Sequence, residues 1–338
     1  MHKLVQMKSK TYNGLDLLKF IMALFVVMIH VKPNAHSEIL TAMLNPIMSV
    51  AVPIFFVLSS VLLFNKLMKV NGGGYAPLLR YSKRLAILYF CWLIVDAWFV
   101  LFKRPYVSDG FPDGCFEFVK DLFLGTTFPG SWFLSALLVS VVLVFLGMRT
   151  IGKWAVLIFT LLLSLYTYYV DMLPAQIRVA YDWYAANVRE EVNLSFPSQM
   201  IWVAIGMWLG CNLEQLIKHR KKFLPWAIGA SVICYMTALC CSNPVLNYVW
   251  VVAICLTAFF IDIPDKPIFK RIRNYSIVIF LFHFSIAGKM LMFCAIVGNT
   301  LLTNWFYYIL VVMVSIAFAE IVLRLEKIPQ LRFLKYLH

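Results

Sequence analysis

Long apolar runs, separated by short polar segments, occupy most of the chain between residues 15 and 323. A helix of about 20 apolar residues can cross the hydrocarbon core of a bilayer. Runs of roughly that length lie near 15–31, 46–65, 85–102, 131–148, 153–170, 199–213, 224–241, 245–262, 275–297 and 304–323. The pattern therefore predicts an all-α, polytopic integral membrane protein with about ten transmembrane helices.

Composition agrees with this assignment and excludes a soluble globular protein. The chain is 62% hydrophobic and only 14% charged, with a mean hydropathy of +0.82. No hydrophilic stretch is long enough to form a soluble domain, so we expect a single transmembrane domain over residues 1–338.

The net charge of +14 is distributed unevenly between the two sides of the predicted bundle. If the N-terminus is cytoplasmic, 22 lysines and arginines lie on inner segments and six on outer loops; Lys19 and Lys289 lie within helices. This asymmetry is the positive-inside rule, and it predicts that both termini are cytoplasmic. The basic charge thus reflects topology, and we expect the bilayer, not nucleic acid, as the partner.

Three ionisable residues share one face of the first apolar run. At about 100° per residue, the eleven steps from Lys19 to His30 end roughly 20° beyond three full turns, and Asp16 falls within about 60° of both. Lys19 and His30 would then lie roughly 16 Å apart along the helix axis. Charges in a membrane helix are costly, which favours a functional site. A structural alternative is that Asp16 pairs with Lys19 while His30 reaches outward to the membrane surface.

A basic cluster precedes the third apolar run. Arg80, Lys83 and Arg84 have i, i+3, i+4 spacing, so they share one face at the start of a helix on the cytoplasmic side. The cluster suits a phosphate-bearing ligand. Ordinary positive-inside anchoring explains the charges equally well.

Five motifs, in order along most of the chain, resemble those of the membrane-bound acyltransferase 3 family. They are Lys19 with His30 after ten intervening residues, Pro53-x-Phe55-Phe56-x-Leu58-Ser59, Arg80-x-x-Lys83-Arg84, Trp132-Phe133-Leu134 and Ile279-Phe280-Leu281-Phe282-His283. Lys19 and Lys83 replace the family's Arg, and Lys lacks the planar fork of a guanidinium. Ser60, where Gly is usual, and Phe282 also depart from the family pattern.

The resemblance implies transfer of an acyl group, expected to be acetyl, from cytoplasmic acyl-CoA to a hydroxyl of an extracytoplasmic surface glycan or lipid-linked sugar. It also implies a multi-pass protein of the bacterial cytoplasmic membrane. An alcohol is a weak nucleophile at neutral pH, so the reaction needs a base, for which His is suited. We expect His30 in that role, supported by Asp16 and Lys19, with His283 next in line. Lys19 and the basic cluster of residues 80–84 would bind the acyl-CoA.

Acceptor binding is expected at the outer side. Two long outer loops, about 103–130 and 171–199, carry aromatic and acidic residues, and Trp183 beside Asp182 would suit a sugar ring. Belt aromatics of any membrane protein are the alternative. We add Trp132 and the intramembrane Asp96 to the candidate acceptor site, although a structural pair would also explain Asp96.

The cysteines show no metal-ligand spacing, and we expect no metal cofactor. Cys115 lies in an outer loop, and a disulfide to Cys240 or Cys241 stays open.

Two other functions also stay open. Buried Asp, Lys, Glu and His could form the proton relay of a coupled transporter or glycolipid flippase, although no inverted repeat is apparent. A sensory or scaffolding membrane protein would leave the one-faced Asp16, Lys19 and His30 unexplained.

Overall fold

The computed structural model describes residues 12–70, 74–103, 106, 110–241, 243–298 and 300–338, without the side chains of 288–297 and 301. Over these residues its secondary structure consists of helices joined by turns and irregular segments, with no strand. The α-helices are α1 (Asn13–Val31), α2 (Glu38–Met68), α3 (Ala76–Val95), α4 (Ala97–Lys103), α5 (Asp113–Leu124), α6 (Ser131–Thr150), α7 (Lys153–Tyr168), α8 (Ala175–Asn187), α9 (Phe196–Lys218), α10 (Arg220–Cys240), α11 (Pro244–Phe260), α12 (Pro267–Val297) and α13 (Leu301–Leu325). Short 3₁₀ helices are η1 (Val170–Met172), η2 (Val192–Leu194) and η3 (Pro329–Leu337).

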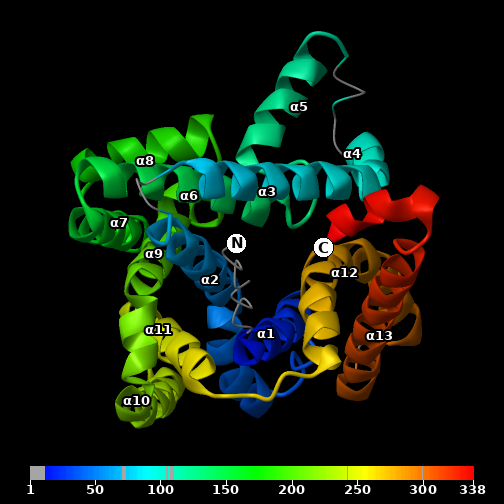
Figure 1. Cartoon of the computed structure of the whole chain (residues 1–338). Helices are drawn as coiled ribbons and strands as arrows, with labels where there is room; N and C mark the ends of the chain where they lie inside the picture. The colour runs from blue at the N-terminus through cyan, green and yellow to red at the C-terminus, as the bar shows by residue number, and fades with distance from the viewer. Residues whose placement is uncertain (1–11, 71–73, 104–105, 107–109, 242, 299) are drawn as a thin grey trace, which may run out of the picture.

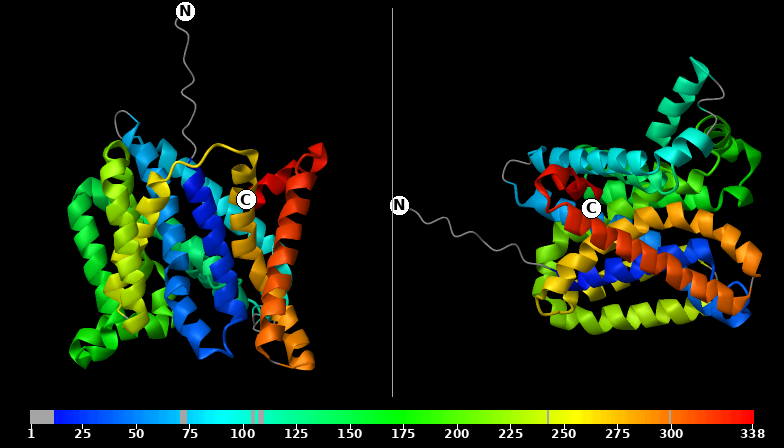
Figure 2. Two further views of the ribbon diagram at one scale, coloured as in Figure 1. Left: turned by 90° about the horizontal axis from the view of Figure 1, so that it is seen from below. Right: turned by 90° about the vertical axis from the view of Figure 1, so that its right-hand side faces the viewer.

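Six helices in the described part of the chain are long and apolar enough to cross a membrane: α1, α2, α6, α9, α10 and α13. The helices α7 and α11 are apolar but shorter. Figure 2 (left) shows α1, α10 and α13 standing upright in one bundle. The all-α membrane fold is therefore confirmed, whereas ten spans and cytoplasmic termini stay predictions.

The predicted run 85–102 is not one continuous helix. α3 ends at Val95, Asp96 forms its C-terminal cap, and α4 begins at Ala97. In Figure 1, α3 lies across the view over its whole length, in contrast to the upright helices of Figure 2. The segments 103–130 and 171–199, predicted as loops, contain the helices α5 and α8.

The centre of the bundle is the contact between α2 and α9. A Cβ atom at Gly206 would lie 2.7 Å from the carbonyl oxygen of Val57, and one at Gly210 would lie 2.6 Å from that of Val61. These two glycines of α9, four residues apart, therefore let the backbones of α2 and α9 approach closely, as in many membrane helix pairs. On the other side of α2, α1 packs against α2, α12 and α13.

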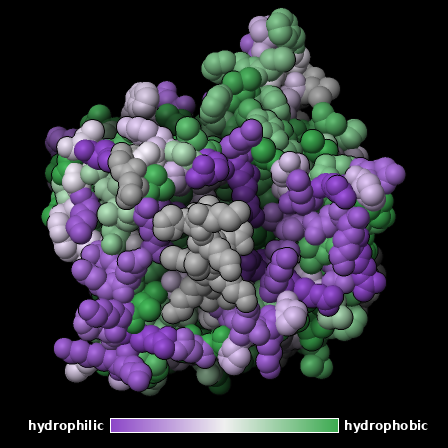
Figure 3. All heavy atoms as spheres, viewed as in Figure 1, coloured by the Kyte–Doolittle hydropathy of each residue, from purple (hydrophilic) through white to green (hydrophobic). Residues whose placement is uncertain are grey.

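Polar side chains gather at one end of the bundle, which we call the basic face. It is formed where α1, α3, α10 and α12 begin and where α2, α9 and α13 end. Figure 3 shows hydrophilic residues over much of this end of the molecule. The C-terminal 3₁₀ helix η3 folds back onto α3, where the Trp92 indole donates a hydrogen bond to the Leu337 carbonyl at 3.2 Å.

Candidate active site

An ion pair joins the start of α1 to α12. Both nitrogens of the Arg273 fork, Nε and Nη2, donate to the Asp16 carboxylate, at 2.7 and 2.6 Å. The Asp16 side chain is 8% exposed and that of Arg273 is 43% exposed. A bidentate guanidinium offsets much of the cost of burying a carboxylate. Asp16 therefore pairs with Arg273, and among the described residues no ion pair joins Asp16 to Lys19.

Lys19 lies one turn further along α1 and is half-buried. Asp16, Arg273 and Arg84 all lie close enough to interact electrostatically with its ammonium group. Because Arg273 already neutralises Asp16, the ammonium of Lys19 remains available to an anionic ligand. Of the three predicted donor-binding cations on α3, the structure thus brings Arg84 nearest to the charged face of α1.

The basic cluster lies within the first turns of α3, on the basic face. Arg80, Lys83 and Arg84 are all exposed. Arg84 donates to the backbone carbonyl of His338 at 3.3 Å, so one of the three cations also fastens the end of η3. Arg80 and Lys83 have no ion pair among the described residues.

Two histidines meet near the opposite end of the charged face of α1. The rings of His30 and His283 are stacked, with centroids 5.2 Å apart and an angle of 29° between the ring planes. Phe284 also contacts His30, with a centroid separation of 4.1 Å. Asp16 and His30 therefore face the same neighbouring helix, α12, as their helical spacing predicts.

The environment of the His283 ring defines its tautomer. His283 is 2% exposed, and its Nδ1 lies 3.0 Å from the Ile279 carbonyl oxygen. A carbonyl only accepts, so Nδ1 carries the proton of the neutral ring and Nε2 carries a lone pair. Within the described structure, that Nε2 is buried and without a hydrogen-bond partner. An unpaired buried acceptor is costly in a bundle core, so this atom needs an explanation.

Aromatic side chains fill the space behind the two histidines. The ring of Phe280 lies 4.9 Å from that of Phe55 and 4.7 Å from that of Phe133. Trp132 is half-buried, and its ring is 6.4 Å from that of Phe56. The second, fourth and late motifs of the sequence thus meet in one apolar cluster. Trp132 belongs to this cluster, and no contact places it directly against His30.

Asp96 lies at the break between α3 and α4, and it is buried. Its carboxylate accepts a hydrogen bond from the Ser285 hydroxyl, two residues beyond His283 on α12. The contact holds the end of α3 against the helix that carries the second histidine. This geometry fits the structural alternative for Asp96. A direct role of Asp96 in acceptor binding stays a prediction.

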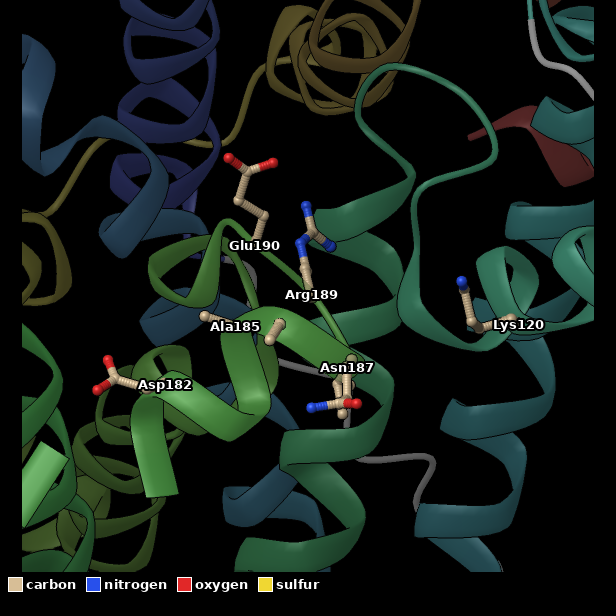
Figure 4. A pocket seen from close by; sticks show the side chains of 8 residues that line it. Lys120, Asp182, Ala185, Asn187, Arg189 and Glu190 are labelled. Carbon is tan, nitrogen blue, oxygen red and sulfur yellow. The ribbon is translucent and has the colours of Figure 1, made fainter. Parts of the chain in front are cut away.

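A pocket of about 580 Å³ opens between α5, the second half of α8 and the segment following α8, at the end of the bundle away from the basic face (Figure 4). Lys120, Asn187 and Arg189 line it. Arg189 donates to the Leu124 carbonyl at 2.7 Å, and burial lowers the pKa of its guanidinium, an effect that the nearby Glu191 opposes. Trp183 is 60% exposed and does not line this pocket, whereas its neighbour Asp182 does.

Cys115, Cys240 and Cys241 are free, so the disulfide left open by the sequence does not form in this structure.

The residue that sequence reasoning missed is Arg273. It belongs to the basic segment at the start of α12, and its charge was explained by the positive-inside rule. The signal that could have identified it is Asp16, because a carboxylate at the start of a membrane helix needs a cationic partner.

A family model described as an acyltransferase domain, that of the acyltransferase 3 family, matches residues 12–324. No curated protein and no solved structure matches the chain. The matched region includes α1 with its three ionisable residues, the basic cluster of α3 and both histidines. The chain therefore belongs to the acyltransferase 3 family, and it is a membrane acyltransferase.

Proposed function

We propose that the protein transfers an acyl group, acetyl by preference, from cytoplasmic acyl-CoA to a hydroxyl of a glycan or glycolipid on the opposite side of the bacterial cytoplasmic membrane. The observation that carries this proposal is the pairing of His30 with His283 on the face of α1 that also holds Asp16 and Lys19. One helical face thus links the basic end of the bundle to a pair of proton acceptors.

At the basic face, cations would hold the phosphates of the donor. Arg80 and Lys83 are exposed, and Lys19 and Arg84 lie within electrostatic range of each other. Phosphate binding by exposed Lys and Arg is a charge effect that salt weakens. The pantetheine arm of acyl-CoA is long and thin, and it suits the distance of roughly 16 Å from Lys19 to His30 along α1.

At the other end, His30 would remove the proton from the acceptor hydroxyl. His30 is exposed and can meet an acceptor, whereas the buried His283 presents a second lone pair beside it. The hydroxyl oxygen attacks the thioester carbonyl carbon, a C–O bond forms and the C–S bond breaks. The proton taken by the histidine then passes to the leaving thiolate, so protons and charge balance.

The test compares base-labile acyl groups on the surface glycan of cells with and without the gene, and of cells carrying His30→Ala. We expect the acyl groups to disappear in both cases while the amount of glycan stays normal. Normal acylation without the gene would exclude the proposal. Loss of the glycan itself from the surface would instead indicate a flippase.

A further inference from the structure

The helix α5 presents an apolar face outward. Four residues of the helix lie within about 100° of arc at the helical repeat: Cys115, Phe116, Val119 and Phe123. Phe116 is 68% exposed, Val119 is 49% exposed and Phe123 is 73% exposed, and Cys115 is also exposed. No polar side chain interrupts this face, which we call the apolar face of α5.

Three polar residues of α5, Glu117, Lys120 and Asp121, lie outside this face and are bonded within the protein, whereas Asp113 at the start of the helix is exposed. Asp121 accepts a hydrogen bond from the Tyr106 hydroxyl and another, of 2.6 Å, from the Thr126 hydroxyl. Glu117 pairs with Lys120 at 2.6 Å. A helix at a protein–water boundary would place its carboxylates outward and its aromatic residues inward. The exposed face of α5 instead carries two aromatic residues and a valine, which indicates that the surroundings of this face are apolar.

The position of α5 in the molecule points to lipid as those surroundings. The helix projects from the side of the bundle, across the direction of the upright helices (Figure 1; Figure 2, right). The projecting segment is mainly hydrophobic in Figure 3. Because the apolar spans place the bundle in a membrane, a helix that leaves its side enters the layer of surrounding lipid.

The depth of α5 in the membrane follows from the pocket that it borders. Lys120 lines the pocket of Figure 4 together with Asn187, the last residue of α8, and Arg189, in the segment between α8 and α9. This is the end of the bundle opposite the basic face. The same helix therefore borders a polar pocket on one side and carries exposed aromatic residues on another. That division is typical of a helix lying in a membrane interface.

We propose that α5 is an interfacial helix that lies along the leaflet opposite the basic face, with Phe116, Val119 and Phe123 among the lipid acyl chains and Lys120 toward the pocket. The lipid then forms one wall beside the pocket, so a lipid-anchored molecule could approach the pocket by diffusing within the leaflet. The proposal does not depend on the reaction that the protein catalyses.

The first test uses a nitroxide spin label on the full chain, reconstituted in phosphatidylethanolamine–phosphatidylglycerol vesicles after replacement of the other cysteines. Labels are attached at Cys115, and singly at Val119→Cys and Phe123→Cys. Ile233→Cys, on the exposed side of the span α10, is the lipid reference, and Asp182→Cys is the aqueous reference. Strong relaxation of the spin label by oxygen indicates that the label lies in lipid, and strong relaxation by a nickel chelate indicates that it lies in water.

We expect labels on the apolar face of α5 to behave like the label at Ile233, with oxygen relaxation several-fold stronger than relaxation by the nickel chelate. Behaviour like that at Asp182 would place the face in water and overturn the proposal. Weak relaxation by both reagents would mean that protein, such as a second copy of the chain, covers the face, which would also overturn it.

A second measurement keeps the native cysteines, in case their removal prevents folding. Phe123→Trp and Glu117→Trp introduce an additional fluorophore at positions about 120° apart around α5, the first within the apolar face and the second outside it. Vesicles with brominated acyl chains quench tryptophan at lipid depth. We expect quenching above that of the wild type for Phe123→Trp and no such increase for Glu117→Trp. Equal quenching of the two variants would overturn the proposal.

Discussion

The imidazole of His283 is placed by the Ile279 carbonyl so that its unprotonated Nε2 stays buried beside the ring of His30, whose centroid is 5.2 Å away. The arrangement joins an exposed histidine to a buried one across α1 and α12. A base that is held in one tautomer and left without a partner needs no rearrangement before it accepts a proton.

His283 should therefore matter for more than packing. In His283→Asn, the amide nitrogen can still donate to Ile279, but the lone pair of Nε2 is lost. We expect acyl transfer to fall about 100-fold or more, as for loss of a general base. The assay is acyl incorporation into glycan by membranes with equal amounts of protein. Near-normal transfer by His283→Asn would restrict His283 to a structural role.

His30 should be equally sensitive. His30→Gln keeps hydrogen-bonding capacity but cannot carry the proton, so we expect it to fail as completely as His30→Ala. The protein should remain folded and inserted, because the residue His30 is exposed. If His30→Gln transfers acyl groups at near the wild-type rate, His30 only positions the acceptor, and His283 becomes the base.

The Asp16–Arg273 pair should contribute to stability. Arg273→Ala leaves a carboxylate that is 8% exposed without its bidentate partner. We expect destabilisation, but by less than the about 3–5 kcal/mol typical of a fully buried pair, since Arg273 itself is 43% exposed. Thermal unfolding in detergent measures it. Asp16→Asn should recover part of the loss in an Arg273→Ala background, because the uncompensated charge is removed.

Lys19 should support donor binding. Lys19→Arg should retain most activity, since it keeps the cation near Arg84 and Arg273, whereas Lys19→Ala should lose it. Initial rates at varied acyl-CoA concentration separate binding from chemistry. Equal rates for Lys19→Ala and the wild type would remove Lys19 from the site.

Arg80 should also contribute to donor binding. An exposed ionic contact is worth about 1 kcal/mol, so Arg80→Ala should raise the apparent donor KM about fivefold with little change in kcat. The effect should shrink at high salt. Lys221→Ala, another exposed cation of the basic face, is the matched control. A KM that responds equally to both substitutions would indicate topology charges, not a donor site.

The orientation of the bundle can be tested with a maleimide that does not cross the membrane. In a chain without native cysteines, Asp113→Cys should react in intact cells and Lys221→Cys should react only after lysis. Both positions are exposed, so access depends on the side of the membrane. The opposite labelling pattern would reverse the topology and the assignment of donor and acceptor sides.

The sequence by itself determined the features that depend on local periodicity. Apolar runs predict membrane helices because a bilayer leaves no other partner for backbone groups, and the spacing of Asp16 and His30 places them on one face of whichever helix they form. The ordered motifs also sufficed to identify the family, which the family match confirms.

Only the tertiary structure decided which residues meet across that face. Arg273 lies 257 residues from Asp16, and His283 reaches His30 from the same distant helix. Helix pairing depends on side-chain packing and close backbone approach, as at Gly206 against α2, and a period of 3.6 residues carries no information about it. For the same reason, the break at Asp96 and the outward apolar face of α5 emerged only once the neighbouring helices were in place.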